Sequence, residues 1–116
     1  MPELFPQLSI LIQALEDIQA NEIVIMDVSK QTSITDYMIV CGGRASRHVK
    51  AIANAIIVKM KEIGLHTLHH SGLDTGDWAL VDFGDCVVHI MQPDTRSFYG
   101  LEHLWGPKTE DMKSVS

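Results

Sequence analysis

Positively charged residues are scarce in this chain of 116 residues. Nine Lys and Arg stand against fifteen Asp and Glu, which gives a formal net charge of −6 with neutral histidine. Nucleic-acid phosphates repel a negative surface, so direct binding of DNA or RNA is disfavoured. The same charge favours a basic protein as partner, because complementary potentials speed association and fix orientation.

Cysteine and long apolar segments are also scarce. Cys41 and Cys86 stand alone in apolar runs and lack the CxxC spacing of zinc or redox sites, so we interpret them as buried thiols. No window approaches the roughly 20 apolar residues of a membrane-spanning helix. The first residues, MPELFPQL, lack the basic and apolar regions of a secretory signal. We therefore expect a cytoplasmic protein that does not contact membranes.

The spacing of apolar residues predicts alternating helices and strands. Helical spacing indicates amphipathic helices over residues 8–18 and 46–63, and Gly64 supplies the stop of the second. The apolar run 23–28 is typical of an inner strand covered on two sides. Further strands are expected at residues 37–41, 65–70, 78–82 and 86–91. A last short helix after Pro93 would carry Phe98, Leu101, Leu104 and Trp105.

This order predicts an α/β fold with a single domain and a mixed β-sheet of about five strands flanked by helices. The sheet must be mixed because the last two strands form an antiparallel hairpin across Phe83-Gly84-Asp85. We assign residues 1–106 to the domain and residues 107–116 to a flexible C-terminal tail, since that segment has little to bury.

Two segments suggest nucleotide chemistry. The turn Gly42–Ser46 lies between a strand and a helix, where backbone N–H groups can receive an anion, but it matches neither established glycine-rich phosphate motif. Asp82 and Asp85 flank the hairpin turn and, with Asp36, are candidate ligands of a divalent ion. The ordinary interpretations are a helix cap at Ser46 and aspartates that form the turn.

The histidines do not form a recognised metal motif. In an extended segment His66 and His70 share a face but lie about 13 Å apart, too far to bind one ion. His89 stands in an apolar strand, and we interpret it as a core or near-surface residue. There is no GxSxG motif and no cysteine with a designated base. We predict no catalytic residue, no metal and no cofactor.

Trp78 is the most informative aromatic residue. It begins a strand directly after the polar loop HSGLDTGD, where a large aromatic side chain is either a lid on the core or an interface anchor. Residues 78, 80 and 82 share one face of that strand, and Ala79 and Val81 face the other. Trp78 and Leu80 therefore either dock together or belong to the core together.

Several short motifs, taken in order across roughly residues 5–105, resemble the ribosomal silencing factor family, also called the Iojap family. Each motif is weak alone, and the resemblance lies in their order and spacing. They are Ser33-Ile34-Thr35-Asp36-Tyr37, Ser46-Arg47-His48-Val49, Gly76-Asp77-Trp78, Asp82-Phe83-Gly84-Asp85 and Leu104-Trp105. The chain departs from the family at Ser71-Gly72, where Glu-Gly is frequent, and at Arg44, where a small or hydroxyl residue is frequent.

The resemblance implies a translation factor without enzymatic activity, built on a sheet related to the nucleotidyltransferases. Such a factor binds the large ribosomal subunit through the basic ribosomal protein uL14, sterically blocks joining of the small subunit, and represses translation when nutrients are scarce. By position, Trp78 is the docking residue, with Asp77, Leu80, Asp82 and Asp85 as its partner-binding neighbours. The alternative is a small nucleotidyltransferase-like, nucleotide-binding domain. Whether the protein is a monomer or a homodimer stays open.

Overall fold

The structure is a computed structural model that describes residues 7–31, 33 and 35–95. The helix expected around Phe98 and Trp105 and the tail at 107–116 lie outside these residues. The order of the elements is the predicted one, and their bounds are α1 Leu8–Asp17, β1 Asn21–Asp27, β2 Tyr37–Gly42, α2 Ser46–Glu62, β3 His69–Ser71, β4 Trp78–Asp82 and β5 Cys86–Met91.

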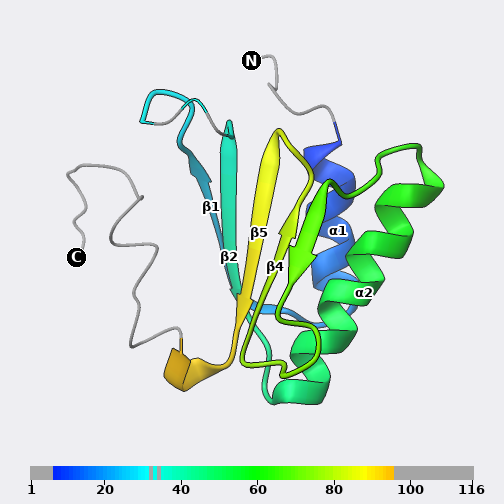
Figure 1. Ribbon diagram of the computed structural model, residues 1–116, viewed down its shortest axis with the longest axis vertical. Coiled ribbons are helices and arrows are strands. Elements are labelled where there is room, and N and C mark those ends of the chain that lie inside the picture. Colours follow the sequence, from blue (N-terminus) through cyan, green and yellow to red (C-terminus); the bar gives the residue numbers. More distant parts are fainter. Residues whose placement is uncertain (1–6, 32, 34, 96–116) are drawn as a thin grey trace.

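The strands form one mixed sheet in the order β1-β2-β5-β4-β3. β2 and β5 run parallel at its centre, whereas β1, β3 and β4 each pair antiparallel with a neighbour (Figure 1). Every residue of β2 and β5 is buried, as unbroken apolar runs predict for central strands. The predicted fold, a mixed sheet of five strands with helices packed on it, is confirmed.

Both described helices lie on the same face of the sheet (Figure 1). α2 buries residues at helical spacing against alternate residues of the central strands, such as Ile39, Val88 and Ile90. Neither helix in the described part has the length and apolar character needed to cross a membrane. The buried residues of the helices are Leu8, Leu11, Leu15, Val49, Ile52, Ala53, Ile56 and Met60.

The other face of the sheet carries a second, smaller cluster. Met38, Val40 and Met91 alternate along β2 and β5 with the residues that face the helices, and Trp78 packs against this group. The alternation follows from the two-residue period of a strand. The Trp78 side chain therefore packs on apolar residues at the face of the sheet opposite α1 and α2.

The prediction that residues 23–28 form an inner strand is wrong. β1 stands at the end of the strand order, and only Met26 among its residues is buried. Ile25 is 42% exposed. The chain turns back after β1 and pairs it antiparallel with β2, so β1 takes the outer position although its composition is that of a covered strand.

The start of α2 also differs from the expectation. Ser46 is the first residue of the helix rather than its cap, and the preceding Ala45 makes no side-chain cap bond. His48 is half-buried: its Nδ1 accepts a hydrogen bond from the Arg44 N–H, and its Nε2 lies 2.9 Å from the Ile18 carbonyl oxygen. His48 thereby joins the beginning of α2 to the end of α1. Gly64, at φ +90°, follows α2 as predicted.

Candidate functional site

Trp78 and Leu80 lie on the face of β4 that is turned away from the helices. Residues 78, 80 and 82 are half-buried, whereas Ala79 and Val81 are buried in the helix-covered core. Trp78 and Leu80 line a surface hollow of about 320 Å³ together with Ser71 and Gly72. The predicted alternation is confirmed, and both large side chains border open space rather than lie in the main core.

Gly72 shapes this hollow. Its φ is +79°, and a Cβ atom at this position would collide with the backbone carbonyl of Trp78. Glycine adopts this conformation without strain, and it has no Cβ atom to make the collision. Gly72 therefore lets the loop after β3 close directly against the first residue of β4.

His89 is the buried neighbour of Trp78. The indole Nε1–H donates a hydrogen bond to His89 Nδ1 at 3.0 Å, and the two ring centroids lie 5.8 Å apart at a tilt of 50°. The pairing of Leu80 with His89, and of Trp78 with Met91, makes Trp78 and His89 diagonal neighbours on one face. Burial lowers the pKa of His89 from 6.5 to about 4, so the ring is neutral at physiological pH.

This burial predicts a loss of stability in mild acid. The unfolded chain binds a proton at His89 near pH 6.5, whereas the folded chain binds it only near pH 4. The free energy of unfolding is therefore undiminished by His89 above pH 6.5 and decreases as the pH drops toward 4. We expect His89 to lower the free energy of unfolding by on the order of 2 kcal/mol between pH 7 and pH 5. Urea titrations of the wild type and of His89→Asn at both pH values measure the difference, and equal pH dependence in the two proteins would contradict the prediction.

The candidate carboxylates stand at the two ends of β4 rather than in the hollow. Asp77 is exposed and accepts a hydrogen bond from Gln92 Nε2 at 3.1 Å. Asp82 lies five residues, or about 17 Å, further along the chain, by the rise of an extended strand. Its Oδ1 accepts the Gly84 N–H at 2.8 Å, which confirms that it shapes the hairpin turn. Asp85 is exposed in the same turn.

The groups that suggested nucleotide chemistry are engaged locally. The Arg44 N–H at the glycine turn is bonded to His48, and an oxygen of Asp82 is bonded within its own turn. Within residues 7–31, 33 and 35–95, no three His, Cys, Asp or Glu side chains are grouped so as to hold a metal ion. None of these observations favours the nucleotide-binding alternative.

The two cysteines are buried thiols and form no disulfide, as predicted. Burial raises the pKa of Cys86 to about 12, and the nearby carboxylates of Asp82 and Asp85 add to the effect. The thiolate is the nucleophilic form of cysteine, and this thiol stays protonated at neutral pH. Cys86 therefore acts as a small apolar core residue.

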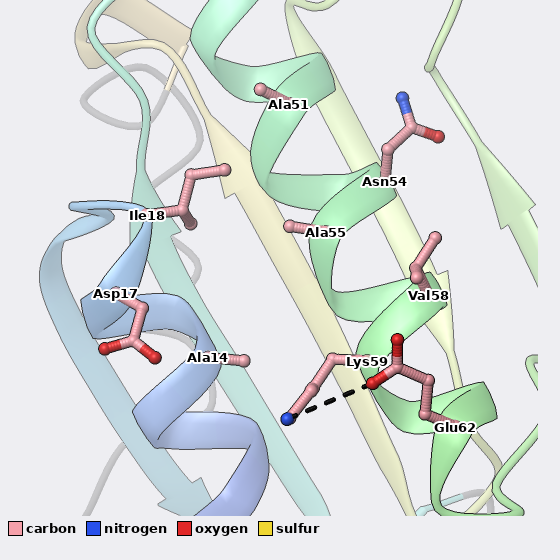
Figure 2. A pocket seen from close by; sticks show the side chains of 9 residues that line it. All are labelled: Ala14, Asp17, Ile18, Ala51, Asn54, Ala55, Val58, Lys59 and Glu62. Carbon is pink, nitrogen blue, oxygen red and sulfur yellow. Dashed lines mark ion pairs between the residues drawn. The ribbon is translucent and has the colours of Figure 1, made fainter.

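A second hollow lies between α1 and α2 and was not anticipated from the sequence (Figure 2). Its volume is about 620 Å³, and Val58 on its wall is 56% exposed. Small residues on both helices leave the space, and an exposed ion pair between Lys59 and Glu62, at 4.0 Å, borders it. The lining residues are Ala14, Asp17, Ile18, Ala51, Asn54, Ala55, Val58, Lys59 and Glu62.

The arrangement defines a class of protein: a small α/β domain that presents an aromatic side chain beside a surface hollow. Residues 2–116 match the family model described as "Ribosomal silencing factor during starvation". The Ribosomal silencing factor RsfS of Chromobacterium violaceum is 48% identical over 95 residues, which are 82% of this chain and 78% of that protein. The chain belongs to the ribosomal silencing factor family, and the resemblance drawn from its motifs is confirmed.

A solved structure and a more distant relative extend the comparison. A crystal structure of a protein from Chromobacterium violaceum superposes with a TM-score of 0.87 at 42% identity, covering 99% of this chain and 95% of that one. The mouse protein named "Mitochondrial assembly of ribosomal large subunit protein 1" is 31% identical over 107 residues, which are 90% of this chain and 47% of the mouse protein. The fold is thus that of a solved protein of closely similar size.

The sequence pattern points to Trp78 and Leu80 but not to the residues that support them. Ser71 and Gly72, which complete the hollow, differ from the family pattern in the sequence, and His89 has the pattern of a core or near-surface residue; neither feature reveals its contact with Trp78. The positive φ of Gly72 depends on how the loop meets β4, and the contact between Trp78 and His89 depends on strand register. A glycine two residues after the expected strand 65–70 is the local signal that the sequence offers.

Proposed function

We propose that this protein binds the large ribosomal subunit through ribosomal protein uL14, prevents the small subunit from joining, and so represses translation under nutrient limitation. Membership of a family described as silencing ribosomes during starvation supports this role. The name of the mouse relative refers to the large ribosomal subunit and supports the choice of subunit. The protein would act in the cytoplasm, as a blocking protein and not as an enzyme.

The observation that carries the proposal is the half-exposed Trp78 beside the hollow. Tryptophan is enriched among the residues that dominate binding energy, above all where its ring fills or borders a pocket that water leaves on association. Leu80 adds apolar area on the same face, so the two side chains form one continuous anchor. We assign docking on uL14 to this surface, which we call the Trp78 surface: Ser71, Gly72, Trp78 and Leu80.

Charge supports a basic partner. Asp77 and Asp85 are exposed at opposite ends of β4, Asp82 is half-buried, and the whole chain carries −6. On a ribosome the RNA repels such a protein, whereas a basic ribosomal protein attracts it. This contrast favours landing on uL14 over non-specific adhesion to RNA.

Subunit joining tests the proposed function directly. Purified protein added in excess to separated subunits is expected to reduce the intact-ribosome peak in a sucrose gradient and to co-sediment with the large subunit, because an occupied joining face excludes the small subunit. Val58→Ser is a matched control, since it alters an exposed apolar residue of the groove between the helices and leaves the Trp78 surface intact. Unchanged joining at saturating wild-type protein would refute the proposal.

A further inference from the structure

We infer that His89 is a positioning residue for docking: its imidazole holds the Trp78 indole in the orientation that meets the partner. The importance of Trp78 for binding rests on the proposed function. The contact between the two rings does not, because it belongs to the free protein.

Two contacts fix the indole ring together. The hydrogen bond of 3.0 Å from Nε1 to His89 Nδ1 sets the position of one ring edge. The tilted ring contact, with centroids 5.8 Å apart, sets the plane. Tryptophan has two side-chain torsions, so one directional bond and one ring contact are sufficient to select a single rotamer.

His89 is a firm base for this contact. It is 7% exposed and lies in β5, the strand paired with β2 on one side and β4 on the other. Trp78, in contrast, is half-buried at the first residue of β4. The fixed residue therefore positions the exposed one.

The protonation of His89 suits an acceptor. Because Nδ1 accepts the indole hydrogen, the neutral ring carries its proton on Nε2. The lowered pKa, about 4, keeps that state at physiological pH. The indole nitrogen has a single hydrogen, and it is directed to His89. Trp78 thus offers its partner an apolar face and edge, which fit aliphatic side chains or the stem and charge of Lys and Arg.

A pre-oriented ring binds more tightly than a mobile one, because ordering a side chain at an interface subtracts from affinity. Replacing His89 with phenylalanine keeps a ring of similar size and removes the acceptor. We expect His89→Phe to weaken binding to purified large ribosomal subunits roughly three- to tenfold. His89→Asn retains an acceptor near the position of Nδ1, and we expect it to bind more tightly than His89→Phe.

Time-resolved fluorescence anisotropy separates positioning from a structural role. The chain has two tryptophans, so Trp105→Phe leaves Trp78 as the only tryptophan, and excitation beyond the tyrosine absorption band reports on it alone. In this parent protein the indole is expected to rotate with the whole domain. His89→Phe should add a nanosecond motion of the ring, and His89→Asn should suppress that motion again. Binding to large subunits is measured on the same three proteins.

The parent protein keeps His89. If its indole rotates independently of the domain, the inference is overturned. Unchanged anisotropy and unchanged affinity in a folded His89→Phe protein would overturn it as well. If His89→Phe does not fold, the parent and His89→Asn decide the matter by their anisotropy, with a held ring in both supporting the inference. A parent that fails to bind large subunits contradicts the proposed function, and its anisotropy still tests His89.

Discussion

Replacing Trp78 with alanine is expected to weaken binding to the large ribosomal subunit by about 30-fold or more, which corresponds to about 2 kcal/mol or more for a binding hot spot. The truncation removes the ring that borders the hollow and leaves the acceptor of His89 without its indole donor. Co-sedimentation or fluorescence titration with labelled protein measures the loss. Inhibition of subunit joining should weaken in parallel.

Two further variants make the Trp78 result specific. Trp78→Phe keeps an aromatic face but cannot donate to His89, so its affinity should fall between those of the wild type and Trp78→Ala. Val58→Ser should bind like the wild type, because Val58 lies in the groove between α1 and α2. Thermal melting of each protein separates lost binding from lost folding, since Trp78 also packs against the apolar cluster that contains Met38, Val40 and Met91. Wild-type affinity in a folded Trp78→Ala protein would remove the Trp78 surface from the proposed interface.

The parts of the fold that could be predicted are those that local pattern determines. α2 follows from apolar residues at helical spacing and from Gly64, which takes the left-handed conformation at its end. β2 follows from an unbroken apolar run of the kind typical of a central strand, and β5 from an apolar run that contains His89. β1 shows the limit of such patterns. Its run of apolar residues resembles that of β2, but the chain's return path places it at the edge of the sheet.

The parts that could not be predicted depend on two segments meeting. Trp78 and His89 are neighbours because β4 and β5 pair in one particular register, and a shift of one residue would put them on opposite faces. The groove of Figure 2 exists because Ala14 of α1 lines the same space as Ala51 and Ala55 of α2, which each helix alone does not reveal. The role of Gly72 likewise depends on the Trp78 carbonyl, six residues later. Motif order points to Trp78 as the candidate, and tertiary contacts show which residues support its ring.

Gly72→Ala is expected to destabilise the protein far more than the matched change Gly64→Ala. Both glycines have positive φ, +79° and +90°, a conformation that costs an alanine about 1–2 kcal/mol. A Cβ at Gly64 meets no atom within 4 Å, so that variant should lose only this amount. At Gly72 the added carbon also meets the backbone of Trp78 and Ala79, which must move. We expect a total loss of about 3 kcal/mol or more, in the range of severe single substitutions.

Urea unfolding of the two variants measures this difference, and binding to large subunits extends it to function. Because Gly72 lies in the Trp78 surface, the backbone shift that relieves its collision moves Trp78 itself. Gly72→Ala should therefore bind less tightly even under conditions in which it is folded, whereas Gly64→Ala should keep wild-type affinity. Equal losses of stability in the two variants would show that backbone conformation alone sets the requirement for glycine. Such a result would contradict the close approach of the loop to β4 on which the shape of the hollow depends.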